Sequence, residues 1–275
     1  MPSDLHMHTT CSDGVLTPEE LLETAIKAGL NYIAITDHDN VAGLRQLYEA
    51  GLYPQKGIKI IPGIEFSAHD ATRSVHILGY NIDIYNRELC DRLNDVVEGR
   101  WTRFSSMIAK LQNLGYDISE TDVLQIADVS TSISRSHIAQ ALVKKGLFPT
   151  IKETFDQVLE KGKAAYVSHY CLEAAEIVDI IKGAGGVPVL AHPGLIGDDE
   201  LVETLLKNGI EGIEAIYPRH NAEETRKYIA LAEKYHLLVT GGSDFHGIVG
   251  RYPEKIGEFT IEDSYAKELY REMDI

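Results

Sequence analysis

Histidines and carboxylates occur in this sequence at spacings that suit the binding of metal ions. His6 and His8 are two residues apart in the segment DLHMHTTCSDG, and Asp13 follows within the same segment. DLHMH, residues 4–8, predicts a short strand, in which residues i and i+2 point to the same side, so both imidazoles can bind one ion. Asp244 and His246 repeat this spacing near the other end of the chain. Both pairs are therefore candidate metal ligands.

Similar side chains follow or lie within most of the predicted strands. The full set of candidate ligands is His6, His8, Asp13, His38, Glu65, His76, His192, Asp244 and His246. A single histidine is usually an ordinary core or surface residue, and Asp37 and Asp39 beside His38 are explained as turn or cap residues. Imidazole and carboxylate without thiolate suit Zn²⁺, Mn²⁺ or Fe²⁺. At three or four ligands per ion, nine candidates predict two or three divalent ions.

The elements that must position these residues alternate in the α/β manner. Strand-length apolar runs such as YIAIT and VPVLA are separated by helical segments such as TPEELLETAIKAG and NAEETRKYIALAEKYH. This alternation is typical of βαβ units and favours a barrel-like parallel sheet. Functional residues of such barrels gather at the carboxyl ends of the strands, which is where most of the candidate ligands fall.

The strand signal is lost in the middle of the chain. The segment NRELCDRLNDVVEGRWTRFSSMIAKLQNLG predicts a long amphipathic helix, and ISETDVLQIA, SRSHIAQALVKKG and IKETFDQVLEKG predict shorter helices after it. We therefore expect a barrel formed by residues 1–85 and 170–275, with an inserted, mainly helical subdomain at 86–169.

Composition limits the classes of protein to consider. The chain has 275 residues, 44 % of them hydrophobic, and a net charge of −16 that disfavours an extended nucleic-acid-binding surface. We find no run long enough to span a membrane and no secretory signal. Three cysteines without a metal-like spacing fit a reducing compartment, so we expect a cytoplasmic protein.

The motifs together resemble a known family. DLHMHTTCSDG, ITDHD, PGIEFSA, HILGY, LAHPG and GSDFHG are similar to the successive motifs of the PHP (polymerase and histidinol phosphatase) family. They most closely resemble its standalone phosphoesterases, which include nucleotide 3′,5′-bisphosphate phosphatases and 5′-to-3′ exoribonucleases. ISRSHIAQALV and AYVSH in the insert follow the same branch. The resemblance covers nearly the whole chain and implies a distorted (β/α)₇ barrel with a trinuclear metal centre.

The resemblance also implies a ligand set for each ion. One ion would be bound by His6, His8, Glu65 and Asp244. A second would share Glu65 and use His76 and His192, and a third would use Asp13, His38 and His246. Together they imply a metal-dependent phosphoric ester hydrolase that attacks with a metal-bound hydroxide, with Glu65 as a shared catalytic ligand.

Further residues are implied at the substrate site. Arg135 and His137 begin a predicted helix, where an arginine and the helix N-terminus can bind phosphate. By resemblance they are candidate substrate-binding residues, together with Ser168, His169 and His220. We also expect His220 to protonate the leaving group. The predicted substrate is a 3′,5′-bisphosphonucleotide or a short 5′-phosphorylated oligonucleotide.

Three other interpretations stay open from the sequence. A small phosphomonoesterase similar to histidinol-phosphatase is disfavoured by the helical insert with its arginine. A metal-dependent amide hydrolase is disfavoured by the expected excess of positive charge at the site. A noncatalytic accessory domain is disfavoured by the complete set of candidate ligands.

Overall fold

The computed structural model describes residues 2–54, 57–69, 74–127, 135–168 and 172–270. The chain divides into a barrel unit, residues 1–93 and 171–275, and a helical unit, residues 94–170. No helix within the described ranges has the length and apolar character needed to cross a membrane. Each unit has its own hydrophobic core.

The barrel unit is built around one sheet with the strand order β8-β7-β6-β4-β3-β2-β1-β9, and β5 pairs with β3. Most neighbouring strands are parallel, but β4 runs antiparallel to both β3 and β6. The strands are β1 Pro2–Asp4, β2 Tyr32–Ile35, β3 Lys59–His69, β4 Ser74–Tyr80, β5 Leu172–Glu173, β6 Val187–Leu190, β7 Gly212–Ile216, β8 Leu238–Gly241 and β9 Ile261–Glu262. The predicted α/β class is confirmed, with the antiparallel strands β4 inside and β9 at the edge of a mainly parallel sheet.

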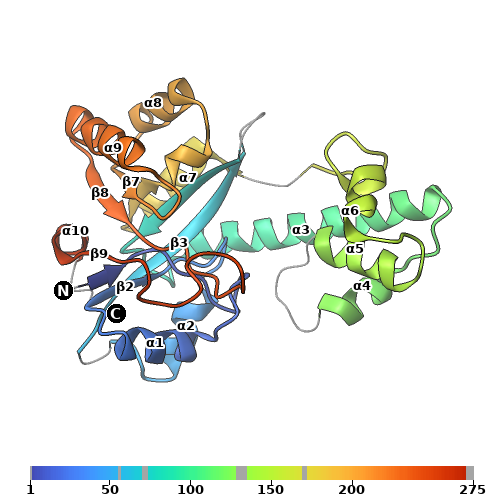
Figure 1. Cartoon of the computed structure of the whole chain (residues 1–275), viewed down its shortest axis with the longest axis horizontal. Helices are drawn as coiled ribbons and strands as arrows, with labels where there is room; N and C mark the ends of the chain where they lie inside the picture. The colour runs from blue at the N-terminus through green and yellow to red at the C-terminus, as the bar shows by residue number, and fades with distance from the viewer. Residues whose placement is uncertain (1, 55–56, 70–73, 128–134, 169–171, 271–275) are drawn as a thin grey trace. The chain divides into compact units, whose positions relative to one another are not determined.

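Helices surround this sheet (Figure 1). They are α1 Pro18–Lys27, α2 Ala42–Glu49, α7 Ala174–Gly183, α8 Asp199–Lys207, α9 Ala222–Tyr235 and α10 Asp263–Leu269, with a short 3₁₀ turn at Pro193–Leu195. The start of α1 has a local cause in the sequence, because Thr17 and Glu20 form a capping box and Pro18 occupies the first turn. Apolar side chains of the strands fill the barrel interior, including Leu5, Ile61 and Val189.

The helical unit contains the larger part of α3, Arg87–Asn113, and the shorter helices that pack on it (Figure 1). These are α4 Glu120–Ala127, α5 Arg135–Lys144 and α6 Ile151–Thr154, the last continued by a π-helical turn at Phe155–Leu159. Their core includes Phe104, Leu111 and Leu142. The predicted insert begins at residue 86, and the contact-based division falls at residue 94, within α3.

The sheet closes where the segment after β1 meets the segment after β8. Met7 and Phe245 form an isolated parallel bridge, and the His8 amide donates to the Phe245 carbonyl at 2.9 Å. The predicted strand at residues 4–8 is therefore shorter than expected, since β1 ends at Asp4. Residues 6–8 are still held in extended pairing with the opposite end of the chain.

Gly242 is required at this closure. A Cβ atom at Gly242 would lie 2.4 Å from His6 Cβ and 2.5 Å from the His6 amide nitrogen. We expect Gly242→Ala to displace His6 and to lower the free energy of unfolding by about 1–3 kcal/mol, as overpacking does. Urea unfolding measures this, with Gly183→Ala as the control, because a Cβ there meets only Glu88 at 3.6 Å. Equal stabilities of the two variants would contradict the expected clash.

Candidate metal centre

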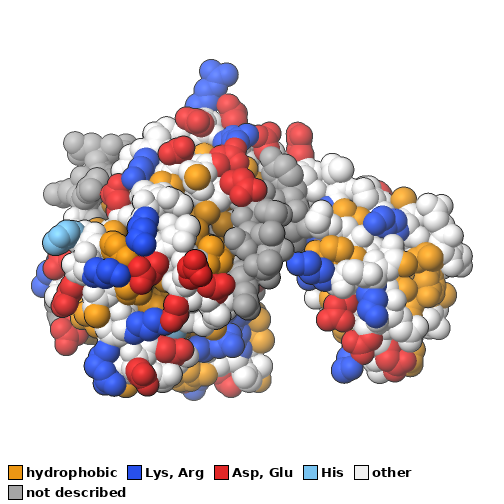
Figure 2. All heavy atoms as spheres, turned by 90° about the horizontal axis from the view of Figure 1, so that it is seen from above, with side chains coloured by type: hydrophobic (Ala, Val, Ile, Leu, Met, Phe, Trp, Pro, Cys, Tyr) orange, Lys and Arg blue, Asp and Glu red, His pale blue; other side chains and the backbone are white. Residues whose placement is uncertain are grey.

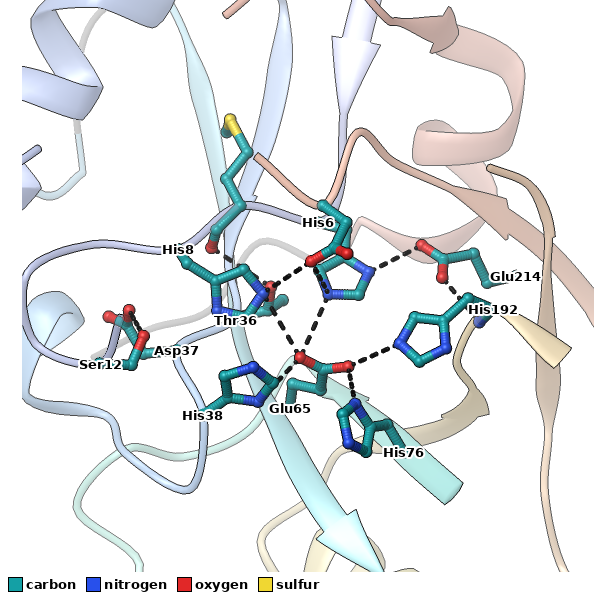
Figure 3. A network of polar contacts seen from close by, with 12 residues as sticks. His6, His8, Ser12, Thr36, Asp37, His38, Glu65, His76, His192 and Glu214 are labelled. Carbon is teal, nitrogen blue, oxygen red and sulfur yellow. Dashed lines mark hydrogen bonds and ion pairs between the residues drawn. The ribbon is translucent and has the colours of Figure 1, made fainter. Parts of the chain in front are cut away.

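Glu65 lies at the centre of a cluster of imidazole rings (Figure 3). This β3 side chain is fully buried, and its Oε1 is 2.8 Å from His76 Nδ1 and 3.0 Å from His192 Nε2. The atoms around its Oε2 are His38 Nδ1 at 3.0 Å, His6 Nε2 at 3.4 Å and His8 Nε2 at 3.4 Å. One carboxylate is therefore in reach of five of the six histidines among the predicted ligands.

His76 reaches the cluster because β4 is antiparallel. It lies near the beginning of β4, paired with Ser67 of β3, whereas the other ligands follow the ends of parallel strands. The beginning of an antiparallel strand lies at the same edge of a sheet as the ends of its parallel neighbours.

Asp244 uses its two oxygens differently. Its Oδ1 lies 3.2 Å from His8 Nε2 and 3.6 Å from His6 Nε2. Its Oδ2 accepts hydrogen bonds from the Tyr217 hydroxyl at 2.9 Å and from Arg251 Nη2 at 2.8 Å. One oxygen thus faces the histidines, and the other is held by the protein.

Asp13 lies at the more exposed side of the cluster. Its Oδ1 is 3.1 Å from His246 Nε2 and its Oδ2 is 3.8 Å from His38 Nε2. His8 Nδ1 lies 3.8 Å from the same carboxylate. The Asp13 side chain is 53 % exposed, whereas the His8 and His246 side chains are almost completely buried.

The structure brings all nine predicted ligand residues together. Three sets have ligand atoms within 4.8 Å of one another, and His192 adjoins them through Glu65. The sets are His8, Asp13, His38 and His246; His6, His8, Glu65 and Asp244; and His38, Glu65 and His76. They overlap at His8, His38 and Glu65, as expected where neighbouring ions share a site.

Several buried atoms of the cluster have no hydrogen-bond partner among the described residues. They are His6 Nε2, both ring nitrogens of His8, His38 Nδ1 and Glu65 Oε2. An unsatisfied buried polar atom costs about 1–3 kcal/mol, so five in one cluster need a compensating partner. Divalent ions supply one, and nitrogen and oxygen donors without sulfur fit Mn²⁺, Zn²⁺ or Fe²⁺. The residues present therefore fit a metal centre.

The electrostatics favour the ligand forms of His8, Asp13 and Asp244. Burial lowers the pKa of His8 to about 3, so its imidazole is neutral. Burial would raise the pKa values of Asp13 and Asp244, but the neighbouring imidazoles of His246 and His8 hold both below the usual range. Burial opposes protonation of His38, yet the Glu65 carboxylate raises its pKa to about 9. The cluster is thus a set of anionic carboxylates around imidazoles, which attracts cations.

Two of the predicted ligands have strained backbones. His192 has φ +26° and Asp244 has φ +52°, in the region that favours glycine. Each such residue costs about 1–3 kcal/mol and persists only where the surroundings enforce it. This strain aims both side chains at the cluster.

Glu214 is a buried carboxylate that the sequence reasoning missed. It lies in β7, where its Oε1 accepts from His6 Nδ1 at 2.9 Å and its Oε2 accepts from the His192 amide at 2.8 Å. The first contact turns His6 Nε2 toward Glu65 and Asp244. A carboxylate that binds the far nitrogen of a histidine ligand fixes its tautomer and orientation. A charged residue in the middle of the apolar segment IEGIEAIY was the available signal.

We expect Glu214→Gln to weaken metal binding by about 10- to 100-fold, because the amide holds His6 less firmly in the required tautomer. Calorimetric titration of the metal-free variant with Mn²⁺ measures this. Glu211→Gln is the matched control, since Glu211 lies on the surface of the same segment and pairs with Lys182. Unchanged metal affinity in Glu214→Gln would contradict the orienting role.

Asp37 and Asp39 are structural, as the turn-or-cap interpretation expected. Asp37 accepts from the Thr9 amide and hydroxyl, both at 2.7 Å, and from the Ser12 hydroxyl at 2.6 Å. These bonds hold the loop that carries Asp13. Asp39 Oδ1 accepts from the Ser67 amide at 3.1 Å.

His220 is held by the backbone through both ring nitrogens. Its Nδ1 donates to the Ala215 carbonyl at 3.0 Å, and its Nε2 accepts from the Gly194 amide at 3.1 Å. Burial also lowers the pKa of His220, so the ring is neutral at pH 7. A ring in this state has no proton positioned for a leaving group. These contacts fix the orientation of the His220 ring, and its role as proton donor stays a prediction.

The predicted substrate-binding residues of the insert lie in the helical unit. Arg135 is the first residue of α5, donates from Nη1 to the Leu159 carbonyl at 3.4 Å and lies 5.7 Å from the ring centres of Phe155 and Tyr166. His137 is half-buried, and burial lowers its pKa. Ser168 lines a cavity of about 640 Å³ in this unit. His169 lies outside the described residues.

The chain is similar to known proteins over most of its length. The sequence model of the PHP domain matches residues 4–174. The 3′,5′-nucleoside bisphosphate phosphatase of Chromobacterium violaceum is 32 % identical, with 98 % of this chain and 96 % of the relative covered. The phosphoribosyl 1,2-cyclic phosphate 1,2-diphosphodiesterase of Eggerthella lenta is also 32 % identical, with 92 % and 97 % covered. The 5′-3′ exoribonuclease Rnm of Escherichia coli is 32 % identical, with 88 % and 84 % covered.

Solved structures match over nearly the whole chain as well. A protein of Bifidobacterium adolescentis assigned as a metal-dependent phosphoesterase has a TM-score of 0.78 and 33 % identity, covering 97 % of this chain and 94 % of its own. An amidohydrolase of Chromobacterium violaceum, solved with bound SO₄ and no metal, has a TM-score of 0.76 and 31 % identity, with 99 % and 98 % covered.

Proposed function

The chain belongs to the PHP domain family and is a metal-dependent phosphoesterase, and we propose that it hydrolyses phosphate esters of nucleotides. The substrate that we favour is a 3′,5′-bisphosphonucleotide, with short 5′-phosphorylated oligonucleotides as the alternative. Relatives named for each activity match most of this chain. We also infer a cytoplasmic location, because the three cysteines do not show the number or spacing typical of a disulfide framework.

The observation that carries this proposal is the convergence of nine side chains around Glu65. We propose three divalent ions, Mn²⁺, Zn²⁺ or Fe²⁺, with two as the smaller alternative. His6, His8, Glu65 and Asp244 would bind one; Glu65, His76 and His192 a second; and Asp13, His38 and His246 a third. The overlap of the ligand sets at Glu65 and His8 supports shared ligation.

Bound divalent ions would neutralise charge on the phosphoryl oxygens and acidify a water molecule. The chain's own residues set the charge of the site. Among the described residues, the three ligand sets contain the carboxylates of Glu65, Asp13 and Asp244, and Glu214 lies behind His6, so three divalent ions leave an excess of positive charge. This excess favours a phosphate ester over a neutral amide.

The surface of the protein favours a small substrate over a long nucleic acid. On the face shown in Figure 2, acidic and basic side chains are interspersed over the barrel unit without a continuous basic stretch. A net charge of −16 acts in the same direction, because a long phosphate backbone is repelled. We therefore expect any RNA substrate to be a short fragment.

A substrate panel tests the proposal. Phosphate release is measured from adenosine 3′,5′-bisphosphate, a short 5′-phosphorylated RNA, a ribose cyclic phosphate and histidinol phosphate after loading with Mn²⁺, Zn²⁺ or Fe²⁺. An amide substrate is included because one structural relative is described as an amidohydrolase. We expect the highest kcat/KM with the bisphosphate. Preference for histidinol phosphate, or hydrolysis of the amide alone, would overturn the proposed substrate class.

A further inference from the structure

Arg251 is a cation in direct contact with a predicted metal ligand, Asp244. Its Nη2 donates to Asp244 Oδ2 at 2.8 Å, while Asp244 Oδ1 lies 3.2 Å from His8 Nε2. The guanidinium is thus one carboxylate away from the histidines of the metal centre. This residue belongs to neither the predicted ligands nor the predicted substrate-binding set.

Only part of the guanidinium is used by this contact. The Arg251 side chain is 43 % exposed, whereas Asp244 is 10 % exposed. Within the described ranges, no second hydrogen bond or ion pair is made by its other side-chain nitrogens. An arginine has five N–H donors in a planar fork, so several remain for another partner. A bidentate anion such as phosphate matches that fork.

Asp244 does not need Arg251 as its only partner. The same Oδ2 accepts a hydrogen bond from the Tyr217 hydroxyl at 2.9 Å. A neutral, buried donor therefore already satisfies this oxygen and orients the carboxylate. Arg251 is therefore not required to orient Asp244, and its side chain is partly exposed to solvent.

The loop after β8 positions Arg251 beside the centre. The Arg251 amide donates to the Ile248 carbonyl at 3.0 Å, which closes a turn. Gly247 has φ +73°, and a Cβ there would meet Val15 at 2.4 Å, so the base of the loop is packed on the segment that follows Asp13. The amide of Val15 also donates to the His246 carbonyl at 2.9 Å. The loop that carries Arg251 is thus held against the segment after Asp13, and both of these segments contain predicted metal ligands.

The barrel unit around Arg251 has a strongly negative net charge, which would repel an anionic substrate. Residues 94–170 contain nine acidic and nine basic residues, so the net charge of −16 resides entirely on the barrel unit. A phosphate dianion that approaches this unit meets a repulsive field. A partly exposed guanidinium at the metal centre lowers that repulsion where the reaction takes place.

We propose that Arg251 binds the phosphoryl group that is hydrolysed, with its fork shared between Asp244 and two phosphoryl oxygens. This proposal rests on the proposed phosphoesterase function and adds a specificity-determining residue to it. Arg251 would touch the substrate directly, and it would favour an anionic phosphate over a neutral amide at the same metal centre.

The test measures binding of inorganic phosphate, the reaction product, to the metal-loaded full-length chain by calorimetry. We expect Arg251→Met to weaken this binding by about 10- to 100-fold, the loss of a charged hydrogen-bonding partner, with an unchanged metal content. Arg251→Lys should recover part of the affinity. With the preferred phosphate ester, Arg251→Met should raise KM more than it lowers kcat.

Two control variants separate substrate binding from a merely structural role. Tyr217→Phe removes the other hydrogen bond to the same Asp244 oxygen, so any loss that it causes acts through Asp244, and we expect its phosphate affinity per loaded site to fall less than that of Arg251→Met. Arg87→Met removes an equal charge from a side chain that is 95 % exposed, and it should change neither the phosphate affinity nor the metal content. If Arg251→Met instead lost metal and kept its phosphate affinity per loaded site, Arg251 would act only through Asp244 and the proposal would fall.

Phosphate binding and hydrolysis are read separately in this design. A wild-type chain that binds phosphate through Arg251 but hydrolyses no phosphate ester would contradict the proposed function and retain this inference. If the wild type hydrolyses phosphate esters but Arg251→Met binds phosphate as tightly as the wild type, the proposed function is retained and this inference is contradicted.

Discussion

Replacing Glu65 with glutamine is expected to reduce phosphoesterase activity by about 1,000-fold or more, because several kcal/mol of transition-state stabilisation depend on the ions that Glu65 is proposed to share. Its Oε1 and Oε2 together adjoin five histidines, so no other side chain occupies an equivalent position in the described cluster. Glutamine keeps the volume but removes the charge that attracts and bridges cations. Phosphate release and metal content by elemental analysis measure both consequences.

The matched control for this variant is Glu23→Gln on the surface of α1, where Glu23 is 67 % exposed and pairs with Lys27. It should retain full activity and metal content. If Glu65→Gln kept its ions and its activity, the convergence around Glu65 would not be the reaction centre.

Removing bound metal with a chelator is expected to abolish activity and to lower the Tm of the barrel unit by several degrees. An ion that binds only the folded state stabilises it by about 2.7 kcal/mol at 100 times its Kd, and 1 kcal/mol shifts the Tm of a protein of this size by about 2–4 °C. The unpaired buried atoms of His6, His8, His38 and Glu65 give the structural reason for this coupling.

Thermal unfolding before chelation, after chelation and after addition of Mn²⁺, Zn²⁺ or Fe²⁺ measures the effect. The Glu65→Gln variant is the internal control, because its Tm should respond much less to the same treatment. A wild-type Tm that is insensitive to chelation, with activity retained, would exclude a structural and catalytic role for metal at this cluster.

The ligand residues and the local elements were readable from sequence. The capping box of Thr17 and Glu20 and the apolar run before Asp37 depend on neighbours a few residues away. The sequence predicted one cluster for two reasons. His6 and His8 have an i, i+2 spacing, and most of the other candidate ligands occur at the ends of successive strands. The structure brings these residues together across the barrel edge.

Two features of the helices and strands were not predicted correctly from the sequence. The segment IKETFDQVLEKG was expected to form one helix, but α6 ends at Thr154 and a π-helical turn follows, because the pattern of apolar residues does not distinguish helix types. The antiparallel direction of β4 was not predicted, since alternation of strands and helices does not reveal the direction of a strand that follows its neighbour directly.

Only the tertiary structure decided the roles that depend on contacts between distant residues. Glu214 meets His6 across 208 positions, Arg251 meets Asp244 through a turn, and His220 is locked between two backbone groups. Residue type and local spacing determine which metal-ligating and hydrogen-bonding groups a strand or helical turn presents on one side, because this depends only on residues a few positions apart. Which donor satisfies which acceptor is fixed by strand register and burial, and these arise only when the barrel closes.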